Sequence, residues 1–229
     1  MPDTTLEELL ERNARHTDSL SPEHFARVRD QQSPAVVSVC CSDSRVSQEG
    51  MWDVREPGWL FTPSTIGNQV WDDVAGEQVV AGSVLYPMLH TETRITAVVG
   101  HTGCGAITAA LAAVREGRPD LPPGLQTQID SLVPVVEAGL ADDRVAPDRK
   151  PSVIDQLVEH NVDAQVNFLV DRPEIPDEER IFGFVYDFQG VYGVVDGRAY
   201  LVNADGETDL DHLVSIVPEH LSGHVARLL

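Results

Sequence analysis

Two stretches of sequence decide the fold of this chain: AVVSVCCSDSR at residues 35–45 and ITAVVGHTGCG at residues 95–105. Each begins with a run of small apolar residues, which is typical of a parallel strand covered on both faces. Each turns polar where the predicted strand ends. In an open parallel sheet, sites form beyond the carboxyl ends of the strands. The polar residues of both stretches are therefore expected to lie together.

The polar residues after these strands include two cysteines and one histidine. Cys41 ends the first strand, and His101 and Cys104 flank the turn after the second. Two thiolates and one imidazole suit zinc in tetrahedral geometry, and a site with three protein ligands and an open position is typically catalytic. The sequence therefore predicts a zinc site, with Cys104 at a helix N-terminus, where the helix dipole favours a thiolate.

Asp43 and Arg45 are expected beside this metal. Asp43 can accept a hydrogen bond from a zinc-bound hydroxide, and Arg45 can keep Asp43 ionised through a charge-assisted contact. Alternatively, Asp43 binds the zinc as its fourth ligand and closes the site. A purely structural zinc needs neither residue, so the pair indicates an enzyme that uses zinc hydroxide.

Other reactive residues have simpler interpretations. Cys40 points to the opposite face of the strand from Cys41 and is interpreted as a buried thiol. Neither cysteine has the spacing to Arg45 that a phosphatase loop needs. Asp53 and Arg55 repeat the Asp-x-Arg pattern without a cysteine, which favours a surface loop. The remaining histidines have no ligand spacing: His16, His24, His90, His160, His212, His220 and His224.

Apolar runs alternate with helical patterns along the chain, which predicts an α/β fold with a mostly parallel sheet flanked by helices. The 229 residues suit a single domain, 1–229, with an N-terminal helical arm at 1–32 and a connecting segment at 118–150. Strands are expected at 35–41, 59–62, 95–100, 181–188 and 191–195, with a short edge at 200–202. Helices are expected from Thr5, at 22–31, 76–89, 104–116, 127–138 and 151–169, and weakly at 211–217 and in the last ten residues.

The chain is strongly acidic, with 37 Asp and Glu against 16 Lys and Arg and a formal net charge of -21. Such a surface repels nucleic acid and anionic lipid, so neither is an expected partner. Only one of the basic residues, Lys150, is a lysine. Ordinary solubility is one interpretation of this composition. Adaptation to high salt is the other, and the scarcity of lysine favours it.

The three cysteines form no disulfide framework and suit metal binding in a reducing cytoplasm. The sequence contains no run of about 20 apolar residues, so no segment is expected to span a membrane. The acidic N-terminal residues lack the apolar region of a secretory signal. A cytoplasmic location is therefore expected.

These motifs resemble those of the β-class carbonic anhydrases, whose paired signature is C-x-D-x-R followed by H-x-x-C. Further similarities follow in chain order: Ile66-Gly67-Asn68, Gly82-Ser83-Val84-Leu85-Tyr86, Asn161-Val162-Asp163-Ala164-Gln165-Val166 and Gly183-Phe184-Val185-Tyr186-Asp187. The resemblance implies reversible hydration of carbon dioxide to bicarbonate, one zinc per chain, and a homodimer or larger assembly with N-terminal helices that wrap the partner subunit. Carbon dioxide is expected in an apolar cleft at Val46, Gly67, Tyr86 and Gly105.

The chain also departs from the family pattern. Some members have a regulatory bicarbonate pocket made by a Trp, an Arg and a Tyr. Ser38 and Ser64 replace the Trp and the Arg here, and only Tyr186 is present. That pocket is therefore not expected. Leu85 replaces a common Glu, which removes a polar contact expected at the dimer interface.

Two alternatives use the same residues. The site can act on a related linear substrate, carbonyl sulfide or carbon disulfide, instead of carbon dioxide. The chain can also be a non-catalytic, zinc-stabilised dimeric binding or redox-sensing protein. The Asp43–Arg45 pair argues against the second alternative.

The charge yields a first prediction. A net charge of -21 makes an assembly of two chains self-repelling in dilute buffer, and about 1 M salt shortens the screening length to roughly 3 Å. Melting temperature and dimer content should therefore rise together from about 0.05 to 2 M potassium chloride. Calorimetry and analytical ultracentrifugation measure the two quantities, and flat values for both would leave solubility as the explanation.

Overall fold

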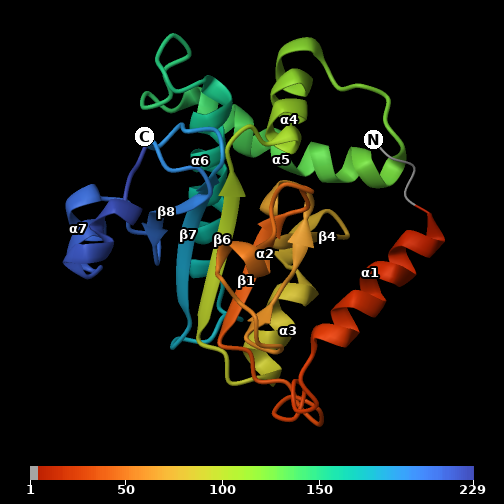
Figure 1. Cartoon of the computed structure of the whole chain (residues 1–229). Coiled ribbons are helices and arrows are strands. Elements are labelled where there is room, and N and C mark those ends of the chain that lie inside the picture. Colours follow the sequence, from red (N-terminus) through yellow and green to blue (C-terminus); the bar gives the residue numbers. More distant parts are fainter. Residues whose placement is uncertain (1–4) are drawn as a thin grey trace.

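One six-stranded sheet organises the chain, shown here as a computed structural model that describes residues 5–229 (Figure 1). The strand order is β2-β1-β6-β7-β8, and β3 also pairs with β1. Every pairing in this sheet is parallel except that of β7 with β8, which confirms the predicted sheet type. The strands are β1 (Val36–Cys41), β2 (Leu60–Phe61), β3 (Ser64–Thr65), β6 (Ile95–His101), β7 (Arg180–Asp187) and β8 (Arg198–Ala204).

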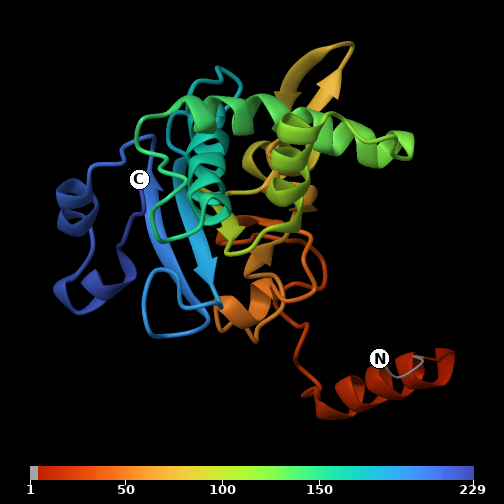
Figure 2. The same cartoon turned by 90° about the horizontal axis from the view of Figure 1, so that it is seen from above.

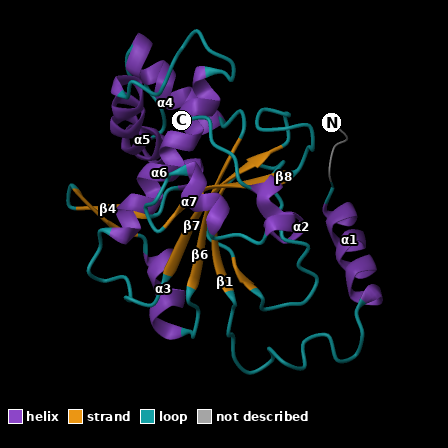
Figure 3. Cartoon of the chain, turned by 90° about the vertical axis from the view of Figure 1, so that its left-hand side faces the viewer, coloured by secondary structure: helices purple, strands orange, loops and turns teal. Residues whose placement is uncertain are grey.

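Helices cover both faces of the sheet (Figure 3). Alternate strand residues such as Val39, Val98 and Val185 face the larger core, where they pack with side chains of α3 (Gly82–His90), α4 (Gly105–Glu116), α5 (Pro123–Ala141) and α6 (Val153–Val170). The opposite face carries two smaller clusters under α2 (Gln48–Met51), α7 (Leu210–Ser215) and the 3₁₀ helix η2 (Glu219–His224). Burial of apolar surface on both faces stabilises the sheet.

Helix α6 lies unusually close to the sheet because two strand positions lack a side chain. A Cβ atom at Gly183 would lie 2.7 Å from Val162 Cγ1, and one at Gly100 would lie 2.7 Å from Val162 Cγ2. Val162 itself is fully buried. These two glycines therefore set the distance between α6 and strands β6 and β7.

The sequence prediction is wrong for three segments. Residues 22–28 form successive turns, with hydrogen bonds such as Ala26 N to Glu23 O at 2.9 Å, instead of a helix. These residues are mostly exposed, so a helix there would bury no apolar face. Residues 191–195 form no strand. Instead β8 extends well beyond the short edge expected at 200–202.

The third error concerns the helix expected at 76–89. The sequence around it instead forms a hairpin, β4 (Trp71–Val74) with β5 (Glu77–Val80), and α3 begins only at Gly82. The two turn residues, Ala75 and Gly76, both have positive φ (57° and 88°), as a tight two-residue hairpin turn requires. Because alanine is not a typical residue of such a turn, the sequence does not indicate the hairpin.

Helix α1 (Leu6–Ser19) begins as expected at Thr5, whose side chain accepts a hydrogen bond from Glu8 N at 3.2 Å. Thr4, which precedes this cap, lies outside the described residues. The helix projects away from the sheet (Figure 2) and has no buried residue. Between residues 5 and 229, no helix combines the length and the apolar character needed to cross a membrane.

The packing of α6 yields a second prediction. Gly183→Ala should lower the free energy of unfolding by about 1–3 kcal/mol, because the added methyl group overpacks the contact with Val162. Gly124→Ala is the control, since Gly124 is an exposed residue of α5 with no atom within 4 Å of its Cβ position. That change should leave stability equal or slightly higher. Urea denaturation measures both, and equal values for the two variants would contradict this account of the packing.

Candidate metal centre

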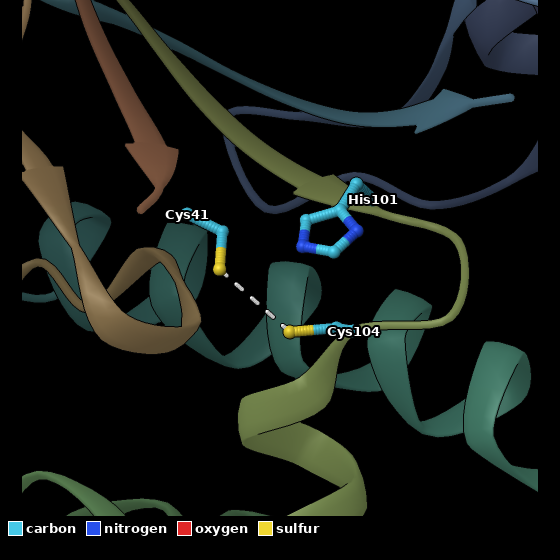
Figure 4. Close-up of side chains that lie close together, drawn as sticks. All are labelled: Cys41, His101 and Cys104. Atoms are coloured by element: carbon cyan, nitrogen blue, oxygen red, sulfur yellow. Dashed lines mark hydrogen bonds between the residues drawn. The ribbon is translucent and has the colours of Figure 1, made fainter. Parts of the chain in front are cut away.

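The carboxyl ends of β1 and β6 bring three potential metal ligands together (Figure 4). Cys41 is the last residue of β1, His101 is the last residue of β6, and Cys104 caps the N-terminus of α4. Their ligand atoms all lie within 4.8 Å of one another, and the two sulfurs are 3.8 Å apart. Each of the three residues is at least 93% buried, so the cluster lies inside the protein and not on its surface.

The imidazole of His101 is oriented for a metal. Its Nδ1 lies 3.0 Å from the carbonyl oxygen of Thr102, so this nitrogen carries the proton and donates it. Its Nε2 is buried and has no hydrogen-bond partner. A buried nitrogen without a partner is costly, and a metal ion at this point would satisfy it. The hydrogen bond from Nδ1 to Thr102 fixes the tautomer of the ring, as is usual for metal-bound histidines.

The two thiols also favour a divalent metal. Their mutual hydrogen bond lowers the pKa of Cys104 to about 4 and raises the pKa of Cys41. Two negative sulfurs this close repel each other, so without a cation only one of them ionises. A dication allows both to serve as thiolates. The donor set of two sulfurs and one nitrogen fits zinc.

Asp43 and Arg45 lie together at the edge of this cluster. Arg45 Nε donates to Asp43 Oδ1 at 2.8 Å, and Arg45 Nη2 donates to Oδ2 at 2.7 Å. The contact holds the pKa of Asp43 well below its usual range. Asp43 Oδ2 also lies 3.5 Å from His101 Nε2. The carboxylate is thus ionised and adjacent to the three ligands, with both of its oxygens occupied by Arg45.

Polar side chains of α6 hold the turn at Gly67, which lies beside Cys41. Asn161 Nδ2 donates to Gly67 O at 3.0 Å and to Asn68 Oδ1 at 3.2 Å, and Gln165 Nε2 donates to Asn161 Oδ1 at 3.1 Å. Gly67 has φ of 73°, and Thr65, two residues before it, pairs with Cys41 in the sheet. The helix therefore positions a metal ligand through a backbone turn.

Asp155, also on α6, supports the second motif in the same manner. Its Oδ1 accepts a hydrogen bond from Gly103 N at 2.9 Å, in the turn between His101 and Cys104. The sequence motifs predict no role for Asp155, Asn161 or Gln165 at the metal centre. The motif at 161–166 contains the two amide side chains, but their spacing alone does not indicate which backbone groups they bind.

An apolar cleft of about 460 Å³ opens beside Cys41 and Asp43. Gly105 lines this cleft, whereas Gly67 does not, although its neighbour Ile66 does. The other lining side chains come mainly from α4, α5 and the segment before α5: Ala106, Ala109, Ala112, Pro119, Leu121, Leu125 and Ile129. The segment 118–150, expected only to connect elements, therefore supplies part of the cleft wall.

Val46 and Tyr86, the other two residues expected in the cleft, lie outside it. Val46 packs against the cluster of Cys40, Ala97 and Val99 on the opposite face of the sheet. Tyr86 is half-exposed on α3 and contacts the rings of Phe61 and His90. Neither lines the cleft beside Cys41. The sequence placed them there by resemblance, and resemblance does not fix which face of an element a side chain occupies.

The simpler interpretations agree with the structure. Cys40 is 1% exposed, and burial raises the pKa of its thiol to about 12. Asp53 and Arg55 form a pair in which both side chains are 83% exposed. Ser38 accepts a hydrogen bond from Trp52 Nε1 at 3.2 Å, and Ser64 accepts one from Gln48 Nε2 at 3.0 Å.

Comparisons with known proteins agree with this geometry. A family model described as carbonic anhydrase matches residues 36–192. Carbonic anhydrase 2 of Mycobacterium tuberculosis is 32% identical over 185 residues, covering 80% of this chain and 81% of that protein. Carbonic anhydrase of Pseudomonas aeruginosa is 30% identical over 183 residues, covering 76% and 79%.

Solved structures share the fold. The Coccomyxa β-carbonic anhydrase in complex with acetazolamide superimposes with a TM-score of 0.70 at 24% identity, covering 93% of this chain and 92% of that one. A structure from Sordaria macrospora, described as one of two tetrameric β-carbonic anhydrases, gives 0.70 at 20% identity, with coverage of 88% and 98%.

The ligand cluster yields a third prediction. Cys41→Ser, Cys104→Ser and His101→Ala should each lose most of the bound zinc and lower the melting temperature, because two ligands hold the ion poorly and metal binding contributes to folding. Cys40→Ser is the matched control, since Cys40 adjoins Cys41 but faces away, and it should keep about one zinc per chain. Mass spectrometry of the metal content measures this. Full zinc occupancy in the three ligand variants would overturn the assignment.

Proposed function

The chain belongs to the β-class carbonic anhydrase family, and from this premise we propose how its residues serve the reversible hydration of carbon dioxide. Zinc is the cofactor of this reaction. The observation that carries the assignment is the buried Cys41, His101 and Cys104 cluster next to an ionised Asp43. Family membership also argues against a purely binding or redox-sensing role.

Cys41, His101 and Cys104 would hold the zinc, which would lower the pKa of a water at neutral pH. Cys41 and Cys104 would provide two negative charges, and His101 would offer its unpartnered Nε2 while Thr102 fixes the other nitrogen. Because two thiolates donate more charge than histidines do, other groups at the site must favour the reactive form of water.

Asp43 is the residue for this task. As an ionised carboxylate it accepts hydrogen bonds but donates none. Its Oδ2 lies 3.5 Å from His101 Nε2, so it is within reach of a water at the metal centre. By accepting the O–H of that molecule, Asp43 orients the remaining lone pair of the oxygen toward the substrate. The bidentate contact with Arg45 orients the carboxylate for this role, and its Oδ2 keeps a lone pair for a further hydrogen bond.

The apolar cleft beside Asp43 suits a small linear molecule without charge. Its lining residues Ala106 and Ala109 are small, and Leu121 and Ile129 make its wall apolar. Carbon dioxide needs little hydrogen bonding and loses little on leaving water. Carbonyl sulfide and carbon disulfide have the same shape, and parallel assays with the three gases or vapours measure the preference.

We propose further that the chain works as a homodimer or a larger assembly. Leu6, Leu9 and Leu10 of α1 are 57–73% exposed, and they share one face of a helix that has no buried residue. A second copy of the chain would cover this face. The Leu6→Ser, Leu10→Ser double variant should then sediment as a smaller species than Arg15→Ser, which alters the opposite face. Identical sedimentation of the two variants would contradict this role of α1.

The remaining proposals concern setting. The three cysteines are free, which suits a reducing compartment, and we propose the cytoplasm. Cell fractionation tests this location. The acidic excess supports adaptation to high salt, for which the salt series described above is the test.

The Asp43–Arg45 pair yields a further prediction. Asp43→Asn should keep its zinc but lower the turnover of carbon dioxide by about 100-fold, a typical loss for a positioned proton acceptor. Arg45→Ala should lower it by roughly 10- to 100-fold, because Asp43 loses its anchor. The exposed pair supplies the controls, Asp53→Asn and Arg55→Ala, which should hydrate carbon dioxide normally. Stopped-flow measurement with metal analysis decides, and normal turnover of zinc-loaded Asp43→Asn would refute the acceptor role.

A further inference from the structure

The loop between β7 and β8 folds back over the second metal motif. Thr102 N donates to Tyr186 O at 3.1 Å, at the end of β7. A Cβ atom at Gly103 would lie only 2.7 Å from the side chain of Gln189, so this loop residue packs directly on the turn. The start of the loop is therefore held against the segment that carries His101 and Cys104.

Internal hydrogen bonds make this loop rigid. The buried carboxylate of Asp187 accepts hydrogen bonds from Gln189 N at 3.0 Å and from Tyr192 N at 2.7 Å. The hydroxyl of Tyr192 donates to the fully buried Glu159 at 2.7 Å, which ties the loop to α6. The residue enclosed by these anchors, Phe188, consequently has a fixed position.

The ring of Phe188 contacts two residues of the metal centre. It stacks on the imidazole of His101 with centroids 5.7 Å apart and an interplanar angle of 22°. The guanidinium carbon of Arg45 lies 4.7 Å from the centroid of the Phe188 ring, within the range of a cation–π contact.

These two contacts differ in importance. His101 is 1% exposed and already held by Thr102, so it needs no further support. The side chain of Arg45 is 48% exposed. It is long and flexible, and an exposed ion pair is weak because water screens it and ordering it costs entropy. Arg45 therefore needs a second contact to keep Asp43 paired.

We propose that Phe188 is a positioning residue that holds Arg45, and through it Asp43, beside the metal centre. The ring fixes the guanidinium on one side while its N–H groups bind both oxygens of Asp43. The consequence for catalysis rests on the role of Asp43 proposed above. The contact itself does not depend on that role, so the two claims can fail separately.

The variants are Phe188→Leu, which removes the ring but keeps an apolar side chain, and Phe188→Tyr, which keeps the ring. Phe182→Leu is the matched control, because Phe182 lies on β7, the strand that leads into the Phe188 loop, far from the metal centre, with Arg180 5.4 Å from its ring. Phe188→Leu should lower turnover at least about two- to five-fold, the factor that an exposed cation–π contact contributes. Phe188→Tyr should restore turnover, and Phe182→Leu should leave it unchanged.

A direct readout is the exchange of the Arg45 Nε proton with water, followed by NMR in the zinc-loaded protein. This proton donates to Asp43 Oδ1, so pairing protects it. Its exchange should be about two- to five-fold faster in Phe188→Leu than in the native chain and in Phe182→Leu. Unchanged exchange would overturn the proposal, whatever the activity. If exchange accelerates while Asp43→Asn is fully active, the positioning holds and the catalytic role of Asp43 fails.

A double variant separates positioning of Arg45 from general support of the site. In the Arg45→Ala background, Phe188→Leu should cause no further loss of turnover, because the residue through which it acts is gone. An equal loss in both backgrounds would show that Phe188 acts without Arg45 and would overturn the proposal. Zinc content and melting temperature, compared with those of Phe182→Leu, control for loss of metal or fold.

Discussion

The parallel pairing of β1 with β6 is the constraint on which the rest of the structure depends. The register places Cys40 opposite Val99, so both strands end at the same edge of the sheet. Cys41 and His101 then meet there although 60 residues separate them. A register slip of one residue would turn one of these side chains to the other face. The apolar runs that bury both strands therefore also set the geometry of the metal centre.

Helix α6 links stability to the site more directly than any other element. One side of the helix packs in the core against the sheet through Val158, Val162 and Val166. Its polar residues bind the two turns beside the ligands: Asn161, supported by Gln165, binds the turn at Gly67, and Asp155 binds the turn at Gly103. Both sets of contacts lie on one rigid helix that the strand glycines allow to approach. Any change that lifts α6 from the sheet would thus also displace the turn beside Cys41.

The sequence predicted the parts of the fold in which one residue pattern has one physical meaning. Apolar runs followed by Cys41 and by His101 leave little choice of strand, face or chemistry. Prediction failed where tertiary context decides. Residues 22–28 were expected to form a helix, but they are mostly exposed and bury no apolar face. The β4–β5 hairpin turns at Ala75, whose φ is positive although it is not a glycine. Phe188 gave no signal, because its importance depends on a loop that returns to a site more than 80 residues earlier in the chain.

The order of synthesis separates the ligands from the α6 residues that hold their turns. All three ligands lie in the first 104 residues, whereas the amides that hold the Gly67 turn come from Asn161 and Gln165. On a ribosome, at about 5–20 residues per second, the ligands precede Asn161 and Gln165 by roughly 3–12 seconds. During that interval the nascent chain carries every donor atom but lacks the side chains that hold the Gly67 turn. Tight metal capture is accordingly a property of the finished polypeptide, acquired only after its second half has been made.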